Sequence, residues 1–164
     1  MKLYLIRHTE AIDYETESVR SDEHRFITPK GRRIAINVFK MIKEEMLDLE
    51  KIFTSPLVRS VQTAEILALT VKYKNDVEIA NELTLSSSPE KVLQLLKRNS
   101  IFKSIALVGH EPMMSTVVKN FTDKKDEEFA FKKAGVCYID MDLDKETGKF
   151  VWYLNPKTSE FQKQ

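Results

Sequence analysis

Two histidines and three arginines stand where their side chains could carry out phosphoryl transfer. His8 follows Arg7 directly after a short apolar run. An imidazole with an ordinary pKa of about 6.5 is largely neutral near pH 7, and a neutral ring nitrogen can attack phosphorus to form a covalent phosphohistidine. That reaction requires the other ring nitrogen to donate its proton elsewhere. A lone histidine at this position would more often be a polar residue that ends a strand. The interpretation of His8 therefore depends on the arginines and the second histidine elsewhere in the sequence.

Three arginines could bind the phosphoryl group that such a nucleophile would accept. Arginine binds phosphate, which carries close to two negative charges near pH 7, through a planar fork of donors. Arg7 and His8 can meet one phosphate only where the strand has already ended, because adjacent strand residues point to opposite faces. Arg59 lies in the first turns of an expected helix, where free N–H groups favour an anion, and Arg25 precedes another helix start. Taken alone, Arg25 and Arg59 would more often be solvated surface charges, and Arg7 would more often form a surface ion pair.

His110 is the second histidine of interest, and it follows Gly109 at the end of an apolar run. It could donate a hydrogen bond to a phosphoryl oxygen and stabilise charge in the transition state. A metal site is the alternative, but His8, His24 and His110 lack metal-ligand spacing and no cysteine cluster accompanies them. The glycine-rich nucleotide-binding motifs are also missing from the sequence. We therefore expect neither a metal nor a nucleotide cofactor.

The elements that must position these side chains follow from the hydrophobic pattern. Four strands are expected, at 3–6, 51–54, 77–80 and 105–108, and the apolar runs at 3–6 and 105–108 are typical of buried strands. The polar stretch from Thr9 to Arg25 predicts an exposed loop. His8 and His110 then fall at the ends of the first and fourth of these strands.

Helices are predicted where a capping residue precedes proline. This signal occurs at Thr28-Pro29, Ser55-Pro56 and Ser88-Pro89. The first helix carries apolar residues at helical spacing up to Met46, and the second should run to about residue 70. A fourth helix is expected over 112–121.

Two strand-like runs near the end of the chain, 136–143 and 149–154, predict a hairpin with its turn at 145–148. Strands and helices otherwise alternate, which predicts an α/β sheet covered by helices on both faces. Residues 1–164 contain no linker or repeat, and we expect a single domain. Ligands in such sheets bind beyond the carboxyl ends of the strands, where His8, Ser55 and His110 are expected.

Four segments together resemble the signature of the histidine phosphatase superfamily, the phosphoglycerate mutase-like proteins. They appear in the order of that signature and span residues 3 to 112. Thr9 stands where glycine is commonest, although alanine and threonine also occur there in relatives. The length and the segment around Arg25 look most like the short SixA-type phosphohistidine phosphatases. The four segments are Leu5-Ile6-Arg7-His8-Thr9-Glu10, Arg25–Gly31, Thr54–Ala64 and Leu107–Pro112.

The resemblance implies a fold, a reaction and a role for each residue. The fold would be a three-layer α/β/α sandwich whose mostly parallel central sheet includes one antiparallel strand. His8 would be the nucleophile, and no metal or organic cofactor would be needed. It would displace the leaving group in line, and water would then hydrolyse the phosphohistidine. The residues implied to form the phosphate pocket are Arg7, Arg25, Arg59 and His110.

The leaving group decides whether a general acid is needed. An alkoxide needs a proton, an effect worth about 10²–10⁴-fold, whereas the imidazole of a phosphohistidine leaves more readily. Glu82 resembles the position that carries the acid in mutase-like relatives, but an ordinary exposed glutamate is an equal alternative. The connection before the strand at 105–108 is too short for a substrate-enclosing lid. An open site of this kind suits a phosphate displayed on a protein.

Other functions stay open on the sequence alone. A broad-specificity phosphomonoesterase would act on small phosphate esters with Glu82 as a working acid. A non-catalytic phosphate-binding module would keep the arginines but would have no need of His8. A mutase is disfavoured because the chain is short for a lid.

Composition excludes several further classes. Lys and Arg number 26 against 25 Asp and Glu, which argues against a nucleic-acid or acidic-membrane partner. No apolar run has the length of a membrane span or signal sequence, and the single Cys137 cannot form an internal disulfide. We expect a cytoplasmic protein that meets a phosphorylated protein or small phosphorylated substrate. The balanced charge and the lack of a long apolar stripe favour a monomer.

Overall fold

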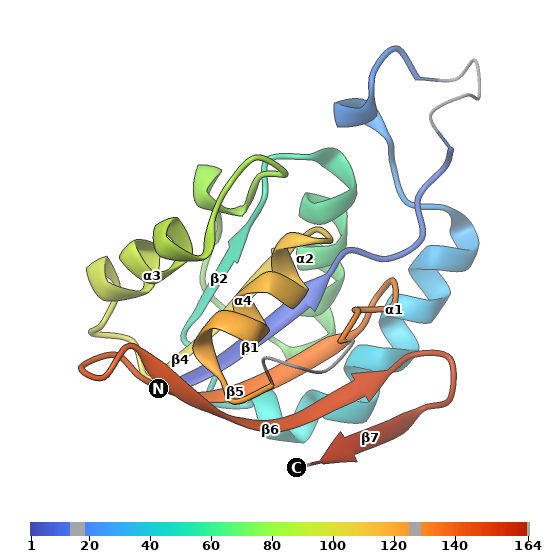
Figure 1. Cartoon of the computed structure of the whole chain (residues 1–164). Coiled ribbons are helices and arrows are strands. Elements are labelled where there is room, and N and C mark those ends of the chain that lie inside the picture. The colour runs from blue at the N-terminus through green and yellow to red at the C-terminus, as the bar shows by residue number, and fades with distance from the viewer. Residues whose placement is uncertain (14–18, 125–128, 164) are drawn as a thin grey trace.

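The computed structural model describes residues 1–13, 19–124 and 129–163 (Figure 1). Within these residues one sheet of seven strands runs through the molecule in the order β3-β2-β4-β1-β5-β6-β7. The predicted strands at 51–54 and 105–108 lie within β2 and β4. The predicted run at 136–143, which precedes the turn at 145–148, corresponds to β5. The strands are β1 (Lys2–Arg7), β2 (Lys51–Thr54), β3 (Val77–Ile79), β4 (Ser104–Gly109), β5 (Val136–Asp142), β6 (Thr147–Asn155) and β7 (Glu160–Lys163).

Strands β1 and β4 lie side by side at the centre of the sheet and pair in parallel, as do β4 with β2 and β2 with β3. All six residues of β4 are buried. Burial on both faces explains why β1 and β4 appear as continuous apolar runs, whereas β3 lies at the sheet edge with Glu78 and Ile79 exposed.

The other half of the sheet is antiparallel and differs from the expectation of a single antiparallel strand. Strands β5 and β7 both run against the rest, so the pairings of β1 with β5, β5 with β6 and β6 with β7 are antiparallel. The chain turns back after Asn155, where the amide of Ser159 donates to the Asn155 carbonyl at 2.9 Å. Strand β7 lies at the sheet edge, and its mostly exposed polar residues explain why no hydrophobic signal predicts it.

Four α-helices flank the sheet within the described residues. Thr28 caps α1 as predicted, because its side chain accepts a hydrogen bond from the Gly31 amide. Helix α2 begins later than the Ser55-Pro56 signal predicts, since the Ser55 hydroxyl contacts His110 rather than capping the helix. The helices are α1 (Pro29–Ile42), α2 (Val58–Val71), α3 (Pro89–Arg98) and α4 (Met113–Phe121).

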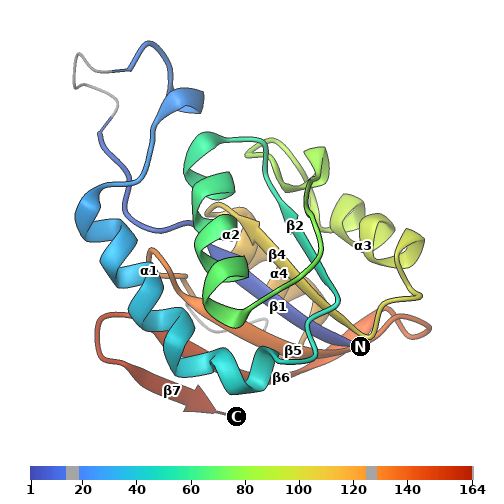
Figure 2. The same ribbon diagram turned by 180° about the vertical axis from the view of Figure 1, so that it is seen from behind.

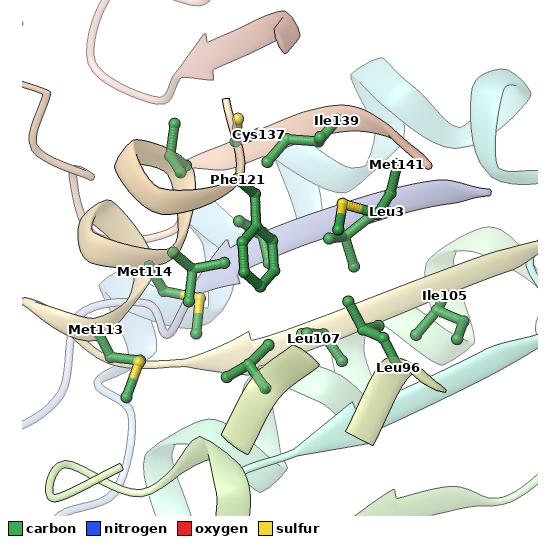
Figure 3. Packing of buried hydrophobic residues seen from close by; sticks show 14 of the residues in the cluster. Leu3, Leu96, Ile105, Leu107, Met113, Met114, Phe121, Cys137, Ile139 and Met141 are labelled. Atoms are coloured by element: carbon green, nitrogen blue, oxygen red, sulfur yellow. The ribbon is translucent and has the colours of Figure 1, made fainter. Parts of the chain in front are cut away.

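The helices cover both faces of the sheet, which confirms the predicted three-layer α/β fold (Figures 1 and 2). On one face α3 and α4 pack against Leu3 and Leu5 of β1 in the core shown in Figure 3. On the other face α1 and α2 pack against Tyr4 and Ile6 of the same strand. This alternation is the period of two that a strand buried on both faces requires.

The loop after β1 is only partly the exposed segment that its polar sequence predicts. Thr9 and Ala11 are buried, and Ala11 forms an isolated antiparallel bridge with Ile27. Residues 14–18 lie outside the described residues. The buried part of the loop therefore anchors the start of α1 beside the end of β1.

Three neighbouring strands end at one edge of the sheet and fix the place of the site. Arg7 at the end of β1 pairs with Gly109 at the end of β4, and Thr54 at the end of β2 pairs with Val108. His8, Ser55 and His110 follow these ends directly, as the alternation of strands and helices predicts. No helix in the described part of the chain has the length and apolarity of a membrane span.

Candidate active site

His8 lies where β1 ends, and the surrounding backbone fixes it. Its amide donates to the Gly109 carbonyl at 3.0 Å, and its carbonyl accepts from the Ala134 amide at 3.2 Å. The ring Nδ1 lies 2.7 Å from the carbonyl oxygen of Thr9. Because a carbonyl can only accept, Nδ1 carries the proton and Nε2 presents its lone pair. This is the tautomer that a nucleophilic imidazole requires.

Burial keeps the imidazole of His8 neutral. Loss of solvation, followed by the proximity of His110, lowers the pKa of His8 to about 3. Burial and the charge of Arg59 likewise lower the pKa of His110 to about 4. The two ring centroids are 5.1 Å apart. Near pH 7 the site therefore holds two neutral imidazoles, and the His8 lone pair stays available.

Arg59 comes from the first turn of α2 and points at His8. Its Nε donates to Nε2 of His8 at 3.3 Å, and its side chain is almost fully buried. The two Nη atoms are held by Asp22: Nη1 donates to the backbone carbonyl at 2.6 Å and Nη2 to the carboxylate at 2.8 Å. The guanidinium is thus fixed at both ends before any substrate binds.

Asp22 is a site residue that sequence reasoning missed. Its carboxylate accepts hydrogen bonds from Arg59 and also from Nη1 of Arg25, at 3.0 Å. Burial alone would raise the pKa of Asp22, but the hydrogen bonds from Arg25 and Arg59 outweigh it and lower that pKa. The one signal in the sequence is an acid three residues before Arg25, and that spacing does not reveal that the loop reaches Arg59.

Arg25 joins the site through this carboxylate. Its Nε donates to the Ile12 carbonyl at 2.6 Å, which ties the two sides of the loop together. The structure brings Arg25 to Arg59 by way of Asp22, and the recorded contacts of Arg25 are with the loop rather than with His8.

Arg7 is held by a segment distant in sequence. Its Nη1 donates to the Phe131 carbonyl at 2.6 Å, and the Phe131 amide in turn donates to Glu111. The Nε of Arg7 is buried and has no hydrogen-bond partner among the described residues. Burial lowers the pKa of Arg7, and the nearby Glu111 carboxylate opposes this effect. A buried donor without a partner is costly, so an anion that accepted from Nε would be favoured.

His110 at the end of β4 contacts two hydroxyl groups. Its Nε2 lies 2.8 Å from Ser55 Oγ and 3.2 Å from Ser60 Oγ. If a serine hydroxyl donates to Nε2, the neutral ring carries its proton on Nδ1. That Nδ1 is buried without a partner among the described residues, so it could donate to a bound oxyanion. The two serines are further site residues that sequence reasoning did not assign.

Thr9 has a structural contact that its place in the signature does not reveal. Its hydroxyl donates to the Gly31 carbonyl at 2.8 Å, and its amide donates to Thr63 Oγ1 at 3.2 Å. The backbones are so close here that a Cβ on Gly31 would lie 2.2 Å from the Glu10 carbonyl oxygen. Thr9 and Gly31 thus join the end of β1 to the start of α1.

The side chain of Glu82 forms its hydrogen bond with Arg98 rather than with the histidines or arginines described above. Glu82 belongs to a short 3-10 segment, Asn81–Leu83, and its carboxylate accepts a hydrogen bond from Nη2 of Arg98 in α3. Its side chain is partly exposed. The structure therefore brings together His8, Arg7, Arg25, Arg59 and His110, whereas Glu82 pairs with a helix on the flank. Within the described residues no group of three or more His, Cys, Asp or Glu could hold a metal ion.

Comparisons with known proteins agree with this geometry. A sequence model of the histidine phosphatase superfamily (branch 1) matches residues 3–84. Phosphohistidine phosphatase SixA of Escherichia coli K12 is 22% identical over 160 residues, which cover 95% of this chain and 94% of that protein. An uncharacterized protein of Picosynechococcus sp. is 30% identical over 139 residues, covering 83% of this chain and 82% of that one.

Solved structures share the whole fold. The protein histidine phosphatase SixA complexed with tungstate superposes with a TM-score of 0.86 at 21% identity, covering 98% of this chain and 100% of that one. A putative SixA of Agrobacterium tumefaciens superposes with a TM-score of 0.78 at 21% identity, with 94% and 97% covered. At this identity the superpositions establish the common fold.

Proposed function

This chain belongs to the histidine phosphatase superfamily, and from that membership we propose that it is a phosphatase that accepts a phosphoryl group on His8 and passes it to water. The observation that carries the proposal is the state of His8. Its Nδ1 proton is held by the Thr9 carbonyl, its Nε2 lone pair faces Arg59, and its pKa of about 3 keeps it neutral. No proton has to leave Nε2 before it attacks.

The reaction has two steps. In the first, a bond forms between His8 Nε2 and phosphorus while the bond to the leaving group breaks, and the leaving group takes a proton from solvent. In the second, a water oxygen attacks phosphorus and releases a proton to solvent, the bond to Nε2 breaks with its electron pair returning to the imidazole, and inorganic phosphate leaves. Positioning and electrostatic stabilisation supply most of the acceleration in such transfers.

Three donors are candidates for hydrogen bonds to the phosphoryl oxygens. The buried Nε of Arg7 and the buried Nδ1 of His110 have no protein acceptor among the described residues. The Nε of Arg59 already lies 3.3 Å from the attacking nitrogen. We assign these three groups to the phosphoryl oxygens, and we assign Arg25 to the support of Arg59 through the shared Asp22 carboxylate.

We propose that the substrate is a phosphohistidine on another protein. That phosphorylated protein would then be the partner of this chain. The similarity to SixA extends over 95% of the chain. The Glu82 carboxylate, at the position that the family resemblance implies for a general acid, is instead paired with Arg98. An imidazole leaving group needs such an acid less than an alkoxide does. Glu82 is accordingly not assigned a catalytic role.

We also propose that residues 1–164 form one domain that acts as a cytoplasmic monomer without a metal or organic cofactor. One sheet runs from β1 near the start to β7 near the end of the described chain, which supports a single domain. The nearly balanced charge supports the monomer, and the single cysteine, buried and free, supports a reducing compartment.

The experiment compares wild type with His8→Ala on a phosphohistidine peptide, a phosphoserine peptide and a small aryl phosphate. We expect turnover of the phosphohistidine peptide by wild type, loss of turnover in His8→Ala, and a trapped phosphoenzyme whose label maps to His8. Efficient turnover of the esters alone would refute the proposed substrate and favour the phosphomonoesterase. Equal inactivity of both proteins on all three compounds would refute catalysis and favour a phosphate-binding module.

A further inference from the structure

A pocket beside Arg7 shares that arginine with the phosphate site, but its other lining residues have no part in the chemistry described above. We name it the basic pocket. Its walls come from the loop after β1, the start of α1, the segment before β5 and the turn between β6 and β7. Figures 1 and 2 show this turn lying beside α1. The charged residues that line it are Arg7, Glu10, Lys30, Lys132, Lys133 and Lys157.

The basic pocket has a larger excess of positive charge than the protein as a whole. Five cationic side chains and one carboxylate line it, whereas the formal net charge of the whole protein is +1. The carboxylate is already engaged: Glu10 accepts from the Thr28 hydroxyl at 2.9 Å and pairs with Lys30 at 3.3 Å. The remaining lysines, 132, 133 and 157, are exposed. The pocket is therefore a concentrated positive surface.

The segment that carries two of these lysines is fixed against the nucleophile. The Phe131 carbonyl accepts from Arg7, and the Ala134 amide donates to the His8 carbonyl at 3.2 Å. Between them, the amide of Lys132 donates to the hydroxyl of Tyr153 at 2.8 Å. Because the backbone is held on both sides, Lys132 and Lys133 stay at a constant place beside the phosphate-binding arginine.

Among the described residues, the lining of the pocket near Arg59 includes no lysine or arginine. This pocket is lined by Asp22 and Glu23 together with Leu57 and Leu85. Glu23 is exposed there, whereas the Asp22 carboxylate is already paired with Arg25 and Arg59, so the excess of positive charge lies on the Arg7 side of the site. This asymmetry can orient a large ligand, because opposite charges attract and like charges across an interface are unfavourable.

We propose that the basic pocket docks acidic side chains that flank the phosphorylated residue of a protein substrate. The inference rests on the proposed phosphatase function and specifies which phosphoproteins the site prefers. The lysines lie on exposed surface segments rather than around an enclosed cavity, so they suit the surface of a protein more than an engulfed metabolite. Their charges raise the local concentration of an acidic partner and its rate of association.

The test uses two phosphohistidine peptides of equal length, one with glutamates and one with glutamines around the phosphohistidine. Wild type should have about tenfold higher kcat/KM for the acidic peptide at low salt. Raising the ionic strength to about 1 M should remove most of this preference, because the Debye length falls to about 3 Å. The variant K132Q/K133Q/K157Q should lose the preference while retaining wild-type kcat/KM on the neutral peptide.

A matched control removes three lysines at the opposite end of the sheet. The variant K74Q/K145Q/K149Q has the same change of charge, and it should keep the preference for the acidic peptide. Equal kcat/KM of wild type on both peptides would overturn the proposal, and so would an equal loss of preference in both triple variants.

A binding measurement separates this proposal from the proposed function. The unphosphorylated acidic peptide is titrated into His8→Ala protein with the lysines present or replaced by glutamine. Weaker binding after replacement would support the docking surface even if wild type hydrolysed neither peptide. Unchanged binding would count against the docking surface whatever the catalytic result.

Discussion

Replacing Asp22 by asparagine tests how the site holds its central arginine. The carboxylate accepts from Arg59 at 2.8 Å and from Arg25 at 3.0 Å through different oxygens. Asparagine offers one oxygen and one NH₂ group, so Asp22→Asn can keep one of these bonds and must turn a donor toward the other cation. The backbone carbonyl of the same residue would still accept from Arg59.

The size of the effect follows from the exposure of the pair. A hydrogen bond to a charged group contributes about 1.5–3 kcal/mol. The Asp22 side chain is 41% exposed while that of Arg59 is 4% exposed. Solvent screening at Asp22 therefore reduces the loss to about 1 kcal/mol. If Arg59 is used in the transition state, this loss of alignment lowers kcat/KM about fivefold.

The assay is kcat/KM for a phosphohistidine peptide, together with the inhibition constant of vanadate as an oxyanion probe. Both should change in the same direction: slower turnover and weaker inhibition. Glu23→Gln is the matched control, because it removes one charge from the exposed neighbouring side chain. Faster turnover or tighter vanadate binding in Asp22→Asn would refute the reasoning, since Asp22 would then compete with phosphate for Arg59.

Three further predictions concern pH, packing and the flanking carboxylate. The pKa of His8 in the folded protein is about 3, below its value in the unfolded chain, so the unfolded chain binds more protons between about pH 6.5 and 3 and stability falls as the pH drops through that window. The melting temperature of His8→Asn should therefore depend less steeply on pH than that of wild type, and an identical slope would contradict this. Gly31→Ala places a Cβ against the Glu10 carbonyl and should lower the free energy of unfolding in urea by about 1–3 kcal/mol, whereas an unchanged midpoint would show that the backbones separate at little cost. Glu82→Gln should change kcat/KM for a phosphohistidine peptide by less than about threefold, because the carboxylate pairs with Arg98; a loss of 10²-fold or more would identify Glu82 as the acid after all.

The strands and the residues at their ends could be predicted because both leave a local signal. Continuous apolar runs mark β1 and β4, and His8 and His110 follow those runs directly. Once parallel pairing is assumed, the two histidines must lie at one edge of the sheet. The cap at Thr28 was equally local, since it depends on a bond within one helical turn.

What the sequence could not predict depends on contacts between distant segments. Arg7 is held by Phe131, 124 positions further along the chain, and Asp22 is held by Arg59, 37 positions away. Neither pairing has a periodic pattern that would indicate it. The Ser55-Pro56 signal predicted a helix cap, but a tertiary contact with His110 uses the hydroxyl instead. Strand β7 escaped prediction because an exposed edge strand buries too little to impose an apolar pattern.

The pairing of β1 with β4 determines how far apart the His8 and His110 rings lie. Adjacent strands lie about 4.7–4.9 Å apart, and the two imidazoles that follow them are 5.1 Å apart. The His8 amide donates to the carbonyl of Gly109, the residue directly before His110. The main-chain hydrogen bonds between β1 and β4 thus set the spacing of the His8 and His110 imidazoles.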